Sequence, residues 1–126
     1  MHVLFLPEKV KSKIMIETYR KIIENAWENR SLLEDTETQK SIRACIELLD
    51  KGELRVAQPT DIGWQVNEWV KKAVILYFPI QKMEVSQAGV LEFHDKMKLK
   101  TGYKELGIRV VPHAVSRYGA YISKGV

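Results

Sequence analysis

The sequence predicts an α+β fold with three main helices and several short strands. Three stretches repeat apolar residues at the spacing of a helix face, namely residues 16–30, 37–51 and 68–78. Between and after them the pattern shortens and alternates, around residues 53–58 and 90–93, which is typical of strands. A chain of 126 residues is long enough for one small domain with a real hydrophobic core.

The first predicted helix, residues 16–30, has one apolar face and one charged face. Its apolar residues recur three or four positions apart: Ile16, Tyr19, Ile23, Ala26 and Trp27. Residues 1–14 match no such pattern, and we expect them to be a disordered extension. Met15 directly precedes the helix, so Met1 and Met15 are both candidate starts of translation.

The second predicted helix, residues 37–51, carries signals at both ends. Thr36 and Gln39 stand at the spacing of a capping box, and Gly52 suits the left-handed position that follows a helix. The apolar stripe of this helix contains the single cysteine, Cys45, which we expect to be buried. One cysteine excludes an internal disulfide and a cysteine-rich metal site.

The third predicted helix, residues 68–78, is open to a second interpretation. Residues 73–78 are apolar almost all round, and such a run also fits a buried strand. We prefer a helix because the spacing from Trp69 onward is helical, with Asn67 as its N-cap and Pro79 as its stop.

The predicted strands are short. Residues 53–58 alternate apolar and polar side chains, and after a turn Trp64 and Val66 begin a second strand. Residues 80–90 read as a loop with short extended pieces before the strand at 90–93. The lysines of residues 96–100 alternate with apolar residues, which indicates a solvated edge strand.

Composition limits the function without deciding it. The chain is 45% hydrophobic and 29% charged, and it has no run of about 18 apolar residues, so we expect no membrane-spanning helix. The single cysteine fits a reducing, cytoplasmic setting. The net charge of +4 suits nucleic acid, but equally anionic metabolites such as acyl-CoA or dicarboxylates.

The histidines do not form a recognisable site. His2, His94 and His113 are scattered, and neither HxxxH nor CxxC spacing occurs, so we expect no metal site. His94 and Asp95 are adjacent and would point to opposite faces of a strand, so they are exposed polar residues rather than an acid–base pair.

Arg109 is the strongest candidate for a ligand contact. It lies in an extended apolar run, residues 107–111, which follows a predicted helical turn at 103–106. An arginine in apolar surroundings needs a carboxylate, either from the chain itself, which is slightly favoured, or from a ligand. Arg117 is less constrained and faces water. The chain ends on the apolar Val126, and we expect its function to need residues beyond it.

At these residues the sequence resembles a known family. The segment GIRVVPHAVSRYGAYI (107–122) is similar to the junction segment of the bacterial tetrahydrodipicolinate N-succinyltransferases. The similarity continues upstream in the same order through IIENAWENR (22–30), IELLDKGELRVA (46–57) and WQVNEWVKKAVILYFPI (64–80). It departs at His113 with Val115 and Ser116, where other members have a second proline and more alanine.

The resemblance implies a two-part architecture. Residues 15–106 correspond to the N-terminal α+β domain of the family. Residues 107–126 correspond to the junction and the start of a left-handed parallel β-helix of hexapeptide repeats, which is absent from this chain. The family's catalytic acidic residues and its succinyl-CoA groove belong to that absent part. The resemblance therefore implies no catalytic residue in this chain and no activity for it alone.

The resemblance also implies a reaction and a role for Arg109. Members transfer succinyl from succinyl-CoA to tetrahydrodipicolinate, ring-opened as 2-amino-6-oxopimelate, in lysine and diaminopimelate biosynthesis. Arg109 matches the arginine of the family's RVVP motif, which binds a substrate carboxylate. Succinyl-CoA is the co-substrate, no cofactor is permanently bound, and homotrimers form their sites between subunits. The alternatives are a small basic nucleic-acid-binding or interaction module, and a regulatory or assembly fragment without chemistry.

Overall fold

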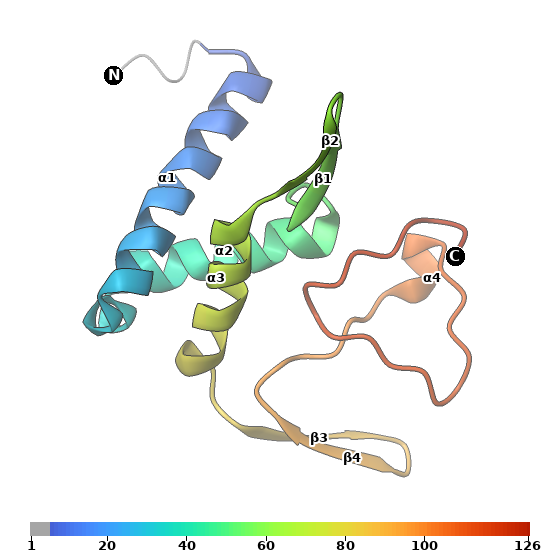
Figure 1. Ribbon diagram of the computed structural model, residues 1–126. Helices are drawn as coiled ribbons and strands as arrows, with labels where there is room; N and C mark the ends of the chain where they lie inside the picture. The colour runs from blue at the N-terminus through green and yellow to red at the C-terminus, as the bar shows by residue number, and fades with distance from the viewer. Residues whose placement is uncertain (1–5) are drawn as a thin grey trace.

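Three helices form the body of the protein. A computed structural model describes residues 6–126, with α1 (Glu8–Glu28), α2 (Thr36–Lys51) and α3 (Glu68–Tyr77) packed against one another (Figure 1). A short 3-10 helix, η2 (Arg30–Glu34), joins α1 to α2, and another, η3 (Phe78–Ile80), extends α3. Together with the short strands described below, these helices confirm the predicted α+β class.

Helix α1 begins earlier than the sequence predicted. Its first residue is Glu8, directly after Pro7, so residues 8–14 are helical and the expected disordered extension is wrong for them. Four of these seven residues are Glu or Lys, which are good helix formers, and Lys11 Nζ pairs with Glu8 Oε1 at 3.0 Å. The part of that prediction that concerns residues 1–5 lies outside the described residues.

Helix α2 is capped one residue earlier than predicted. Asp35, not Thr36, is the N-cap, and its Oδ2 accepts a hydrogen bond from the Thr38 amide at 2.9 Å. Gln39 does not complete a capping box, since its side-chain amide donates to the Leu33 carbonyl at 2.8 Å. Gly52 ends the helix in the left-handed conformation, with φ of 75°, which confirms the prediction.

The apolar run that could also have been a buried strand is helical in the structure. Residues 73–77 belong to α3, and Trp69, Val70, Ala73, Leu76 and Tyr77 are buried. Asn67 stands at the N-cap, but its side chain makes no capping bond. Instead its Nδ2 donates to the Arg55 carbonyl at 2.8 Å, so it ties the start of α3 to the segment that precedes β1.

The core lies where the three helices meet. Its fully buried side chains come from all three helices and include Ile23, Ile42, Cys45, Val70 and Leu76. Burial of Cys45 was predicted and is confirmed. No helix among residues 6–126 combines the length and the apolar character that crossing a bilayer requires.

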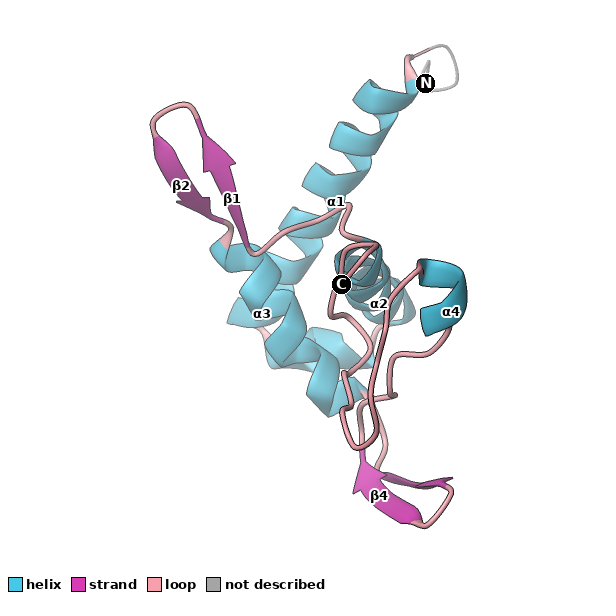
Figure 2. Ribbon diagram, turned by 90° about the vertical axis from the view of Figure 1, so that its right-hand side faces the viewer, coloured by secondary structure: helices cyan, strands magenta, loops and turns pink. Residues whose placement is uncertain are grey.

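Within residues 6–126 the strands form two separate antiparallel hairpins (Figure 2). In the first, β1 (Ala57–Thr60) pairs with β2 (Gly63–Val66), so the predicted strand at 53–58 is displaced toward the turn. The second consists of β3 (Glu84–Ala88) and β4 (Leu91–Asp95), where a loop with short extended pieces was predicted for residues 80–90.

The lysine-rich stretch, residues 96–100, is not the predicted edge strand. Only Leu99 forms a bridge, with Arg117, and the rest of the stretch is irregular. Helix α4 (Tyr103–Leu106) is the predicted single turn, and Gly107 closes it with φ of 69°. Beyond α4 the chain has no further helix and no named strand.

Candidate functional site

The C-terminal segment, residues 107–126, holds the predicted site residue and folds back on itself beside α4 (Figure 1). Its two ends meet through backbone hydrogen bonds. The Gly125 amide donates to the Gly107 carbonyl at 2.9 Å, and the Arg109 amide donates to the Val126 carbonyl at 2.8 Å. The segment is therefore a closed loop, although it contains almost no regular secondary structure.

Arg109 is exposed, in contrast to the apolar setting that the sequence predicted. Of its neighbours, Ile108 is buried whereas Val111 is 54% exposed, because this run does not enter a sheet. None of the ion pairs among residues 6–126 includes Arg109, so the predicted pairing with an internal carboxylate does not occur. Its guanidinium is consequently free to meet a carboxylate from solution.

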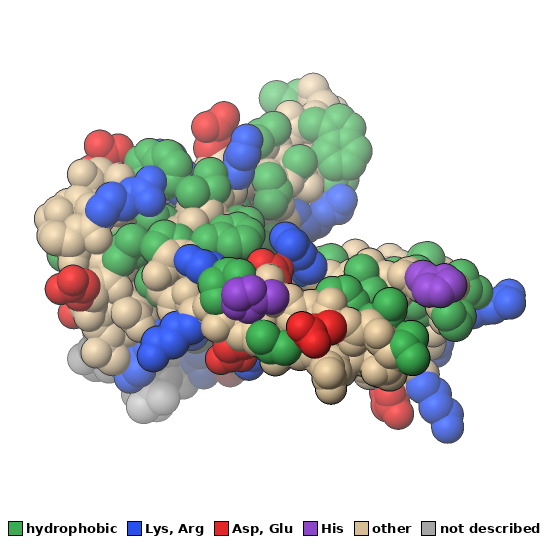
Figure 3. All heavy atoms as spheres, turned by 90° about the horizontal axis from the view of Figure 1, so that it is seen from below, with side chains coloured by type: hydrophobic (Ala, Val, Ile, Leu, Met, Phe, Trp, Pro, Cys, Tyr) green, Lys and Arg blue, Asp and Glu red, His purple; other side chains and the backbone are tan. Residues whose placement is uncertain are grey.

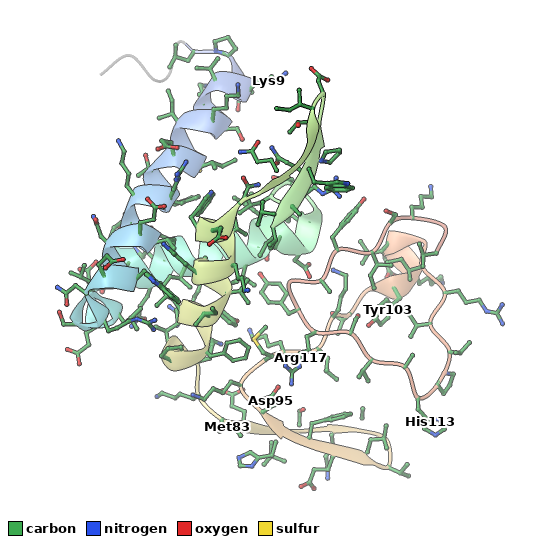
Figure 4. The ribbon with its side chains drawn as sticks, viewed as in Figure 1. Lys9, Met83, Asp95, Tyr103, His113 and Arg117 are labelled. Atoms are coloured by element: carbon green, nitrogen blue, oxygen red, sulfur yellow. The ribbon has the colours of Figure 1, made fainter. Side chains whose placement is uncertain are left out.

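The other candidate residues do not gather around Arg109. Arg117 makes an ion pair with Asp95 of β4 at 3.0 Å, instead of only facing water (Figure 4). Asp95 is thus engaged with Arg117 rather than with its neighbour His94. The two histidines in the described part, His94 and His113, are exposed and lie far apart on the surface (Figure 3).

Asp50, near the end of α2, anchors the C-terminal segment. Its Oδ1 accepts a hydrogen bond from Lys100 Nζ at 2.7 Å and another from the Gly119 amide at 2.9 Å. Lys100 is only 7% exposed, although its lysine-rich stretch predicted a solvated side chain. Sequence reasoning missed this contact because nothing in the pattern of either segment indicates that residues 50 positions apart meet.

A second anchor joins Tyr118 to α2. The Tyr118 hydroxyl donates a hydrogen bond to Oε2 of Glu47, and the Tyr118 amide donates to the Lys98 carbonyl at 2.8 Å. Burial, and then this hydrogen bond, raise the pKa of the Tyr118 hydroxyl well above its usual value. The same hydrogen bond lowers the pKa of Glu47 below its usual value. Tyr118 is therefore a neutral donor and Glu47 a charged acceptor.

Two clefts flank Tyr121 in the C-terminal segment. One, of about 450 Å³, lies between the segment and the start of β1 and is lined by Arg55, Ala57 and Gly119 among others. The other, of about 430 Å³, lies toward α4 and is lined by Lys100 and Leu106 among others. Within residues 6–126, no three side chains of His, Cys, Asp or Glu come together as metal ligands.

Comparison with known sequences identifies the family. The profile described as Tetrahydrodipicolinate N-succinyltransferase N-terminal matches residues 18–80, half of the chain and most of the three-helix body. The chain belongs to this family. The resemblance seen in the sequence is thereby confirmed.

Individual members of the succinyltransferase family are similar over most of the chain. Three of them are named 2,3,4,5-tetrahydropyridine-2,6-dicarboxylate N-succinyltransferase. That of Bordetella petrii is 42% identical over 114 residues, covering 82% of this chain and 42% of the relative. Those of Coxiella burnetii (strain Dugway 5J108-111) and Variovorax paradoxus are 44% and 39% identical, covering 81% and 88% of this chain and 41% and 44% of the relatives. The chain spans about two fifths of the length of these relatives.

Proposed function

We propose that the chain is the N-terminal part of an enzyme that transfers succinyl from succinyl-CoA to tetrahydrodipicolinate. Family membership supports the reaction, because the similar proteins carry the name of this succinyltransferase. In this proposal residues up to 106 form the N-terminal domain, and the C-terminal segment leads into a β-helix of hexapeptide repeats. The enzyme is a cytoplasmic homotrimer, needs no permanently bound cofactor, and serves lysine and diaminopimelate biosynthesis.

The observation that carries the proposal is the exposed guanidinium of Arg109. It has no ion-pair partner among residues 6–126, and it projects from a segment that two contacts with α2 hold in place. A guanidinium offers two parallel N–H donors to a carboxylate, and the proposed substrate carries two carboxylates. Arg109 would bind one of them and so orient the substrate.

The reaction then needs this substrate to be held against the thioester. The amine nitrogen of the ring-opened substrate attacks the thioester carbonyl carbon of succinyl-CoA, the new C–N bond forms, and the C–S bond breaks. The amine loses a proton, and CoA leaves as the thiol. Arg109 contributes by positioning the nucleophile. The groups that bind succinyl-CoA are proposed to lie in the rest of the enzyme, including the neighbouring subunit, so the 126 residues alone transfer no succinyl.

A chimeric enzyme tests the proposal. These 126 residues are joined to the part of the Bordetella petrii relative that follows the matched region, and release of the CoA thiol is measured. We expect activity from the chimera and none from the 126 residues alone. Lack of activity in a folded chimera, or thiol release by the chain alone, would contradict the proposal.

Variants of Arg109 in the chimera test its role. Arg109→Ala should raise KM for the dicarboxylate about 10- to 100-fold, because a hydrogen bond to a charged group contributes about 1.5–3 kcal/mol. KM for succinyl-CoA should stay unchanged. Arg109→Lys keeps the charge without the planar fork and should lie in between. An equal effect on both substrates would count against this role.

A nucleic-acid-binding module is the weaker reading, since family membership favours the enzyme. It predicts binding to nucleic acid that weakens steeply as salt is raised. A titration of labelled duplex DNA and RNA at two salt concentrations separates the two readings.

A further inference from the structure

One oxygen of Asp50 joins two distant parts of the chain. Its Oδ1 receives the ammonium of Lys100 at 2.7 Å and the Gly119 amide at 2.9 Å, and the Lys100 ammonium also lies 3.4 Å from the Asp50 carbonyl oxygen. The lysine belongs to the stretch before α4, whereas Gly119 belongs to the C-terminal segment. Because α2 is packed in the core, Asp50 presents a fixed acceptor to both.

From this carboxylate a path of hydrogen bonds, joined through the residues that make them, leads to the neighbour of Arg109. The Lys100 amide donates to the Ser116 carbonyl at 2.8 Å, and the Ser116 hydroxyl meets the Tyr103 hydroxyl at 2.7 Å. The Tyr103 carbonyl in turn accepts from the Ile108 amide at 2.9 Å. Arg109 follows Ile108 directly, so four hydrogen bonds and the residues between them connect Asp50 to the backbone of Arg109.

We propose that Asp50 is a positioning residue that sets the place of Arg109 relative to the helical body. The C-terminal segment has almost no regular secondary structure, so its conformation depends on contacts of this kind. A binding group displaced by even about 1 Å loses much of its effect on a reaction. This inference rests on the proposed function of Arg109, and it assigns to α2 the task of aligning the substrate-binding segment.

Amide hydrogen exchange in the 126-residue chain tests whether Asp50 holds the C-terminal segment in place. The variant Asp50→Ala/Lys100→Met removes the shared acceptor without leaving a buried ammonium group unpaired. We expect the Gly119 and Ile108 amides to exchange at least about tenfold faster, while the Ala73 amide in α3 keeps its rate. Unchanged rates at Gly119 and Ile108, or the same factor at all three amides, would overturn the proposal.

Kinetics of the chimera test whether this positioning affects binding of the dicarboxylate. The double variant should raise KM for the dicarboxylate at least about tenfold and leave KM for succinyl-CoA unchanged, a split that a loss of stability alone does not produce. Glu24→Gln, which breaks the exposed Arg20–Glu24 pair, is the matched control and should leave both values unchanged.

The outcomes separate this inference from the function on which it rests. If Arg109→Ala leaves KM for the dicarboxylate unchanged, the proposed role of Arg109 fails, and the positioning by Asp50 fails with it. If Arg109→Ala raises that KM and the double variant does not, positioning by Asp50 fails while the function stands. Should the double variant not fold, Asp50→Leu/Lys100→Met removes the acceptor at a side-chain volume nearer to the native one, and the same comparisons apply to it.

Discussion

The ammonium group of Lys100 lies 2.7 Å from Oδ1 of Asp50, and only 5% of the Lys100 side chain and 19% of the Asp50 side chain are exposed. This ion pair connects the end of α2 to the stretch before α4. A buried charge that loses its partner is strongly destabilising, whereas removal of both partners often costs little. The two substitutions should therefore be strongly coupled.

A double-mutant cycle measures that coupling. Asp50→Ala should lower the free energy of unfolding by about 3 kcal/mol, because it leaves the Lys100 ammonium buried without a carboxylate. The double variant Asp50→Ala/Lys100→Met should be more stable than Asp50→Ala alone, as urea unfolding will show. A cycle on the exposed Arg20–Glu24 pair is the control, with an expected coupling below about 0.5 kcal/mol. Additive effects at Asp50 and Lys100 would contradict the prediction.

Gly52 has two reasons to be glycine, and Gly89 has one. Both adopt positive φ, 75° and 63°, but a Cβ at Gly52 would lie 2.8 Å from the Tyr121 ring, whereas nothing lies within 4 Å of one at Gly89. Gly89→Ala should cost about 1 kcal/mol for the left-handed conformation alone. Gly52→Ala should cost more, because it also displaces Tyr121.

Thermal unfolding of the two glycine variants provides the measurement, and the NMR signals of the Tyr121 ring show whether it moves. Equal destabilisation with an unmoved Tyr121 signal would show that the ring is not held against the end of α2.

The hydrogen bond between Tyr118 and Glu47 should make stability depend on pH at both ends of the scale. The fold lowers the pKa of Glu47. The ionised Glu47 therefore contributes to the stability of the fold above its usual pKa of 4.5, and this contribution is lost as the pH falls through its pKa in the folded protein. The fold raises the pKa of Tyr118. The neutral Tyr118 hydroxyl therefore contributes fully to stability below its usual pKa of 10.0, and this contribution is lost as the pH rises through its pKa in the folded protein.

Tyr118→Phe removes this hydrogen bond and keeps the ring. The variant should be less stable than the native chain by about 1 kcal/mol between those two pH values, and the difference should shrink at both extremes. Urea unfolding from acid to alkaline pH measures it. Tyr103→Phe, which removes the hydroxyl that meets Ser116, is the control and should show no loss of its effect at acid pH. A difference that is constant across the range would contradict the assigned charges.

Cys45 should be unreactive in the folded protein. Its side chain is fully buried, and this burial raises the pKa of the thiol to about 12, so the reactive thiolate is scarce at neutral pH. Modification by a coloured disulfide reagent at pH 8 should therefore follow the rate of unfolding. Ser12→Cys places a thiol on the exposed part of α1 and should react at once. Equally fast reaction of both thiols would contradict burial of Cys45.

The start of α1 illustrates which helices a sequence pattern can find. An apolar stripe arises only where a helix packs on other elements, and residues 16–27 have one. Residues 8–14 are helical but extend past α2 and α3, where they have little to bury (Figure 1). They therefore left no stripe and were mistaken for an extension. The end of α2 was predictable because the residue that follows a helix often adopts the left-handed backbone conformation, which glycine favours.

The sequence by itself predicted the helices at 37–51 and 68–78, of which the second ends at Tyr77 in the structure, and it also predicted the buried Cys45 and the family. These features depend on local spacing and on motifs. Only the tertiary structure decided that Lys100 is buried on Asp50, that Arg117 pairs with Asp95 and that Arg109 is exposed. A charged side chain takes its environment from residues far away in the chain, and the packing of residues 96–126 on α2 and β4 brings those residues together. The sequence therefore identified Arg109 as the candidate site residue, whereas the tertiary structure determines its exposure and its neighbours.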